Sequence, residues 1–164
     1  PQAFHQLRSL ADQLLKGSLR ILGTGVLEHL HLVELVRKAA KLVEGLGLVH
    51  RVSRLAAGDC SAGMYKTYDI EIWIPSMQIY KEVSSVSNAR DYQARRGSIR
   101  YRQQETGKTD FLHTLNGSGL ATSRVIPAIV EQCQEPDGSI RVPEVLAPWM
   151  FGIDVIHPVK PGNV

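Results

Sequence analysis

Cysteines and long apolar runs are both scarce in this sequence. The two cysteines, Cys60 and Cys133, lie far apart, without the close spacing that a zinc site or a disulfide framework requires. No apolar stretch approaches the ~20 residues of a membrane-spanning helix, and no charged-then-apolar leader with a cleavage site is seen. These absences predict a cytoplasmic protein with no membrane partner.

A strong charge of one sign is also missing. The net charge of +3 is compatible with an RNA or nucleotide partner but does not require one. His29 and His31 form the one close histidine pair, and no cysteine or acidic residue accompanies them at a useful spacing, so solvated histidines are favoured over a metal site. A chain of 164 residues that is 43% hydrophobic can bury one core. Because it starts with Pro1 rather than methionine, we expect a processed chain or a piece of a longer one.

Residues 111–124 read as a strand that runs through a glycine turn into a helix. Thr114 and Asn116 fall on one face of the strand, and Ser118 stands where a helix N-cap is expected. Arg124 follows about a turn and a half inside the helix. Polar side chains, a helix N-terminus and an arginine suit an anion such as a phosphate, although a Gly-Ser-Gly turn more often only caps a helix.

Hydrophobic periodicity divides the rest of the chain into helices and strands. Helices are predicted over 3–16, 30–43, 88–96 with Asn88 as its cap, and 120–134. Strands are predicted over 48–55, 66–74, 80–86, 98–102, 111–116 and 140–142, with 98–102 and 111–116 paired as a hairpin. This order predicts a mostly antiparallel sheet.

Alternation within the predicted strands assigns acidic residues to faces. Asp69 and Glu71 share the polar face of the strand 66–74, where they either face water or line a cleft. Glu82 and Ser84 share a face of the strand 80–86.

Five blocks, in this order and spacing, resemble one enzyme family. They are TYDIEIWIP (67–75), YKEVSSVSN (80–88), DYQARR (91–96), HTLNGSGLA (113–121) and PEVL (143–146). Together they resemble seryl-tRNA synthetase, from about residue 32 to 152, including the segment called motif 3 in class II aminoacyl-tRNA synthetases. The resemblance implies an α+β fold, an antiparallel sheet flanked by helices, as part of a class II catalytic domain. It divides the chain into an unplaced helical segment (1–30), a partial catalytic domain (31–152) and an extended or disordered tail (153–164).

The resemblance also implies a reaction and its partners. The complete enzyme would be a serine-tRNA ligase that activates L-serine with ATP and Mg2+ to seryl-adenylate and transfers the seryl group to tRNA(Ser). It would act in the cytoplasm as a homodimer, without DNA.

Site residues follow from the resemblance position by position. Glu82 and Ser85 match a pair that holds the ATP-bound metal. The segment 82–85, which also includes Val83 and Ser84, matches a block that contacts the nucleotide. Arg124 matches the motif 3 arginine that grips ATP and, with Glu82, is assigned to catalysis. The serine substrate would contact Ser118 and Asn116. Asp69 and Glu71 are left either as structural residues or as residues that support the site residues from behind. Simple alternation puts Glu82 and Ser85 on opposite faces, so both reach one ion only if the strand bulges or ends near Ser84.

Several parts of the family pattern have no counterpart in this sequence. Motif 1, the arginine and glutamate of motif 2, and the threonine and glutamate that recognise the serine amine are missing from it. We therefore expect the isolated chain to be inactive and the ligase activity to belong to the complete enzyme. The alternatives are a short synthetase-like paralogue that binds nucleotides or regulates without aminoacylation, and a purely structural scaffold.

Overall fold

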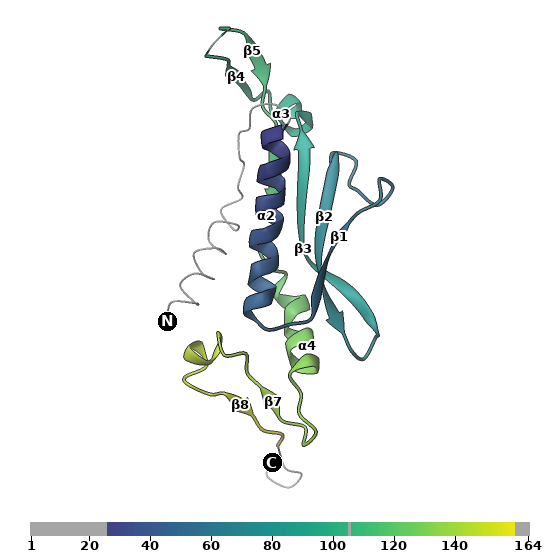
Figure 1. Ribbon diagram of the computed structural model, residues 1–164, viewed down its shortest axis with the longest axis vertical. Coiled ribbons are helices and arrows are strands. Elements are labelled where there is room, and N and C mark those ends of the chain that lie inside the picture. Colours follow the sequence, from purple (N-terminus) through teal and green to yellow (C-terminus); the bar gives the residue numbers. More distant parts are fainter. Residues whose placement is uncertain (1–25, 105, 160–164) are drawn as a thin grey trace.

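The computed structural model describes residues 26–104 and 106–159 (Figure 1). The helix predicted over 3–16 lies outside these residues. In chain order the elements are α2 (Val26–Gly45), β1 (His50–Arg54), β2 (Lys66–Ile74), β3 (Ile79–Arg90), α3 (Tyr92–Arg96), β4 (Arg100–Arg102), β5 (Thr109–Phe111), β6 (Thr114–Gly117), α4 (Thr122–Gln132), β7 (Ile140–Arg141), a 3-10 turn (Ala147–Trp149) and β8 (Val155–Ile156).

Four of these strands form the central sheet. Its order is β1-β2-β3-β6, and each neighbouring pair runs antiparallel. The pairs β4–β5 and β7–β8 form two small separate hairpins. An antiparallel sheet with helices against it confirms the predicted fold class.

One face of the sheet is covered by α2 and α4, and the core lies between them. The apolar residues of β2 alternate toward this face, and Leu115 of β6 and Val86 of β3 continue it. The buried cluster that joins helices and sheet contains Leu32, Leu35, Ala39, Leu42, Val43, Ile70, Ile72, Ile74, Val83, Val86, Leu115, Val125 and Ala128. The helices therefore hold the sheet from behind, and the polar side chains of β2 and β3 lie on its other face, which we call the open face.

The short helix α3 begins later than the sequence predicts, and Asn88 does not cap it. Asn88 is buried inside β3, where its backbone is in register with Lys66 and Leu115. Its side-chain Nδ2 donates to Glu28 of α2 at 3.2 Å. Pairing on both sides and this buried hydrogen bond keep residue 88 in the sheet, so the helix starts only after Asp91.

The predicted hairpin between 98–102 and 111–116 is wrong in its second half. Only Thr109–Phe111 pairs with β4, whereas Thr114–Gly117 crosses over to pair with β3. Leu112, between these two strands, is buried, which turns the chain inward there. The turn brings Asn116 and Ser118 to the central sheet.

The C-terminal region contributes a further pair of short strands. β8 lies inside the predicted tail and pairs with β7, Ile140 opposite Ile156. The helix α2 runs across residue 30, and the division of the chain at residues 30 and 152 stays a prediction. In the described part of the chain, no helix is long and apolar enough to cross a membrane.

Candidate functional site

A β-bulge in β3 places Glu82 and Ser85 on the same face of the sheet. Ile70 lies opposite Ser84, but the next residue of β2, Glu71, lies opposite Glu82, so Val83 is an extra residue in the ladder. Val83 and Ser84 are consequently both buried on the helix side. One ion can reach both residues only if the strand bulges near Ser84, and this predicted bulge is confirmed. The prediction that Glu82 and Ser84 share a face is wrong, because Ser84 lies on the helix side.

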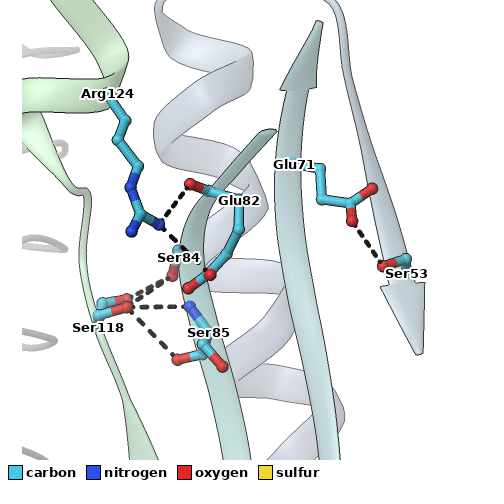
Figure 2. A network of polar contacts seen from close by, with 7 residues as sticks. All are labelled: Ser53, Glu71, Glu82, Ser84, Ser85, Ser118 and Arg124. Carbon is cyan, nitrogen blue, oxygen red and sulfur yellow. Dashed lines mark hydrogen bonds and ion pairs between the residues drawn. The ribbon is translucent and has the colours of Figure 1, made fainter. Parts of the chain in front are cut away.

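The open face gathers three carboxylates around this bulge. The register places Asp69 opposite Ser85 and Glu71 opposite Glu82. Asp69 is buried, and Glu71 is held by Arg51 and by the Ser53 hydroxyl, whose Oγ donates to Glu71 Oε1 at 3.2 Å (Figure 2). Neither side chain simply faces water, and both contribute negative charge to the surface that carries Glu82.

Ser118 joins the end of β6 to β3. Its backbone N–H donates to Ser85 O at 3.0 Å, and its hydroxyl oxygen accepts the Ser85 N–H at 3.0 Å. The buried Ser84 hydroxyl donates to Ser118 O at 2.6 Å. The expected N-cap role is therefore wrong: Ala121 occupies the cap position of α4, and the Ser118 side chain extends the sheet instead (Figure 2). A serine satisfies the backbone of a neighbouring strand as readily as that of a helix.

Arg124 reaches from the first turn of α4 over the edge of β3 to Glu82 (Figure 2). Its Nη1 donates to the Glu82 backbone oxygen at 3.0 Å and lies 3.3 Å from Glu82 Oε2. The Ala121 N–H donates to Val83 O at 2.7 Å, which fixes the start of the helix against the same strand. The residues that the sequence assigned to the nucleotide thus come together from two elements 42 positions apart.

Comparisons with known proteins place this geometry in a family. Residues 28–133 match the model of the tRNA synthetase class II core domain (G, H, P, S and T). The chain belongs to this family. Every segment of the open-face site described above lies within the matched residues.

Relatives and solved structures similar to this chain are named as seryl enzymes. The chain is 70% identical to Serine--tRNA ligase 2 of Clostridium acetobutylicum over 119 residues. This aligned region covers 73% of this chain and 28% of the relative. It superposes on seryl-tRNA synthetase from Pyrococcus horikoshii complexed with ATP with a TM-score of 0.74 at 41% identity, covering 79% and 29% of the two chains. Cytoplasmic serine-tRNA ligase from Naegleria fowleri, in complex with AMP, gives a TM-score of 0.70 at 34% identity, with 77% and 30% covered. The chain thus spans less than a third of the length of these relatives.

The remaining predicted site residues of this class II core lie at different depths. Asn116 is half-buried, in register with Ser87, and its Nδ2 lies 4.0 Å from Met64 Sδ. The side chains of Val83 and Ser84 are both 1% exposed and point into the core. Any nucleotide contact at positions 83 and 84 would therefore have to be made by the backbone.

Two supporting residues of the core domain were not predicted from the sequence. Arg51 of β1 binds Glu71 and also lies over the ring of Tyr80, 4.2 Å from its centroid, while Ser53 donates to the same carboxylate. The sequence does carry one signal for them: Arg51 and Ser53 lie at alternate positions of the strand, which predicts that both belong to one polar face. Their partner could not be found without the register of β1 on β2.

Asp69 is expected to destabilise the fold at neutral pH. Burial raises the pKa of its carboxyl, a hydrogen bond with Ser85 lowers it, and the nearby charges of Glu82 and Glu71 raise it, for a net increase. Its Oδ1 is buried and has no hydrogen-bond partner within residues 26–104 and 106–159. Because the pKa of this carboxyl is higher in the folded state than in the unfolded state, the group favours folding at pH values below its unfolded-state pKa. This contribution to stability is lost as the pH rises through the folded-state pKa. Asp69→Asn should therefore raise Tm at pH 7, with the gain shrinking as pH falls toward the ordinary carboxyl range.

Thermal unfolding at a series of pH values measures this effect. The control is Asp59→Asn, the same change at an exposed loop position, which should leave Tm nearly unchanged at every pH. A Tm difference for Asp69→Asn that does not change with pH would contradict the proposed cause.

Proposed function

We propose that this chain is the part of a serine-tRNA ligase that faces ATP and the amino acid. The complete protein would activate L-serine with ATP to seryl-adenylate and transfer the seryl group to tRNA(Ser). The observation that carries the proposal is the meeting of Arg124 with Glu82 beside Ser85, in a core domain whose similar proteins are named as serine-tRNA ligases. A cytoplasmic location and a homodimer of the complete enzyme belong to the same proposal.

Arg124 is suited to hold the nucleotide. Its guanidinium is planar, permanently charged and able to bind phosphate oxygens through two N–H groups at once. Its side chain is 54% exposed and that of Glu82 is 44% exposed, so their ion pair is weak. Arg124 can therefore leave Glu82 and bind a phosphate group at little cost in free energy. Similar solved structures in complex with ATP and with AMP support a nucleotide site in this fold.

Glu82 and Ser85 fit the Mg2+ that accompanies ATP. Both lie on the open face because of the bulge, and a carboxylate and a hydroxyl are hard oxygen donors of the kind that Mg2+ prefers. Within the described residues, no group of three His, Cys, Asp or Glu side chains could hold a metal alone. The phosphates would therefore supply further oxygens, and the ion would neutralise part of their charge.

The amino acid would lie toward Ser118 and Asn116. Ser118 is exposed at the end of β6, and Asn116 lies two residues earlier on that strand, so both belong to the edge of the sheet beside Ser85. A hydroxyl and an amide are suitable hydrogen-bond partners for the serine side chain and amine. In this arrangement the protein contributes mainly by positioning the two substrates against each other.

Binding of a non-hydrolysable seryl-adenylate analogue tests the proposal. Calorimetric titration of the purified chain should show saturable binding, and Arg124→Ala should weaken it about 10- to 100-fold, because a hydrogen bond to a charged group contributes about 1.5–3 kcal/mol. The matched control is Arg37→Ala, which removes an exposed arginine paired with Glu34 on α2, on the covered side of the sheet. Equal affinity in the unaltered chain and in Arg124→Ala would rule out the assigned role of Arg124.

A further inference from the structure

The excess of positive over negative charge in this chain lies in one segment. Residues 90–111, which hold α3, β4 and β5, contain six of the 19 basic and three of the 16 acidic side chains, so they carry the whole net charge of +3. This segment, which we call the basic end, projects beyond the end of β3 (Figure 1). Its five arginines, at positions 90, 95, 96, 100 and 102, are all exposed.

Four of the five arginines of the basic end lie beside aromatic rings, and one of these four is also paired with an acid. The Arg90 guanidinium lies 3.3 Å from the centroid of the Tyr65 ring. Arg96 lies 5.2 Å from the centroid of the Tyr92 ring, and its Nη1 donates to the Tyr92 hydroxyl at 3.0 Å. Arg95 and Arg100 lie 4.6 and 4.3 Å from the Phe111 ring. Arg95 pairs with Asp91 at 2.6 Å, but among the described residues no carboxylate oxygen lies within 4 Å of the other four guanidinium groups.

Guanidinium groups beside exposed rings match the chemistry of an unpaired RNA strand. A guanidinium has five N–H donors, so one that lies near a ring still has N–H groups to offer phosphate oxygens. Tyr65 and Tyr92 are 61% and 41% exposed, which leaves ring surface on which unpaired bases stack. A duplex hides its base faces, so it would use the charges but not the rings.

The basic end is continuous with the amino-acid side of the proposed site. Arg90 is the last residue of β3, the strand that carries Ser85, and the Tyr65 N–H donates to Asn88 O of that strand at 2.8 Å. Met64, next to Tyr65, is the residue whose sulfur contacts the Asn116 amide. An RNA strand that binds along the basic end and continues toward the site would therefore reach Asn116 before it reaches Glu82.

We propose that the basic end binds the unpaired 3′ strand of the tRNA and guides it to the amino-acid side of the site. This inference rests on the proposed function for the identity of the RNA, whereas the surface itself follows from the arginines and rings of residues 65 and 90–111. It assigns RNA contacts to residues outside the nucleotide and serine positions described above.

Fluorescence anisotropy of the purified chain with a labelled single-stranded RNA of about 12 nucleotides ending in CCA tests it, since comparable single-strand sites cover about 4–16 nucleotides. The double variant Arg96→Ala/Arg100→Ala should bind about tenfold more weakly and reduce the salt dependence of log K by about 1.4, or about 0.7 for each lost phosphate contact. The control Arg37→Ala/Lys41→Ala removes two exposed cations from α2 and should bind like the unaltered chain.

The seryl-adenylate analogue separates this proposal from the proposed function. Loss of RNA affinity in the double variant with unchanged analogue affinity supports the basic end, because it also shows that the variant is folded. Unaltered RNA affinity in the double variant, no RNA binding by the unaltered chain, or equal affinity for a duplex of the same sequence would each overturn it. Failure of the unaltered chain to bind the analogue would instead count against the proposed function, and the RNA comparison would still decide the basic end.

Discussion

Serine-dependent exchange of pyrophosphate into ATP is expected to be undetectable with the purified 164-residue chain. The chain corresponds to 28% of the length of the Clostridium acetobutylicum relative, so most of that protein's contacts have no equivalent in it. Each lost contact to the developing charge of a transition state costs about 2–4 kcal/mol, which is roughly 30- to 1000-fold in rate. Losses of this size multiply when several contacts are removed, and two of them already bring the rate near the limit of detection.

The exchange assay needs a demonstration that the preparation is folded. Binding of the seryl-adenylate analogue by the same sample provides it, because the expected result is binding without turnover. A full-length serine-tRNA ligase assayed in parallel shows that the reagents support exchange. Serine-dependent exchange by the 164-residue chain that disappears in Arg124→Ala would show that these residues suffice for adenylate formation, against our expectation.

Patterns carried by consecutive residues were predicted accurately. The strand predicted at 66–74 is β2, residue for residue, because strict alternation of apolar and polar side chains reports one covered and one open face. The helix predicted over 30–43 lies within α2, whose buried stripe meets the same sheet face. Both elements are determined locally, by side chains that repeat at the period of the structure.

Features that depend on a neighbouring strand could not be predicted in this way. The bulge at Val83 moves Glu82 and Ser85 to one face, and only the register against β2 reveals it. Asn88 reads as a helix cap in isolation, but its buried contact with Glu28, 60 residues away, keeps it in β3. Ser118 similarly bonds to Ser85 rather than to its own helix. For Asn88 and Ser118, a tertiary hydrogen bond outweighs a local preference of about 1 kcal/mol.

The candidate site therefore depends on the core that lies behind it. Glu82 is directly followed by the bulged pair Val83 and Ser84, whose side chains are buried against the helix layer. The position of the carboxylate is set by that packing and not by contacts of its own, since Arg124, its one side-chain partner among the described residues, is exposed. A loss of packing behind β3 should consequently displace the Glu82 carboxylate on the open face.

Truncation of Leu32 is expected to be among the most destabilising single changes in the helix layer. Leu32 of α2 is 1% exposed and belongs to the cluster that joins the helix to β2, β3 and β6. Leu32→Ala should lower the free energy of unfolding by about 2–5 kcal/mol, from lost burial and from the cavity left behind. Measured against a total stability of about 5–15 kcal/mol, this is a large fraction. Urea unfolding should show a lower midpoint with an unchanged slope.

Leu30→Ala makes the same chemical change on the same helix and isolates the contribution of burial. Leu30 is 57% exposed, so its truncation should change the free energy of unfolding by no more than about 0.5 kcal/mol. Alanine and leucine are both strong helix formers, so helix propensity shifts both variants slightly and in the same direction. A similar loss of stability in the two variants would mean that α2 does not pack on the sheet through Leu32. The core behind the bulge would then have to be formed by α4 alone.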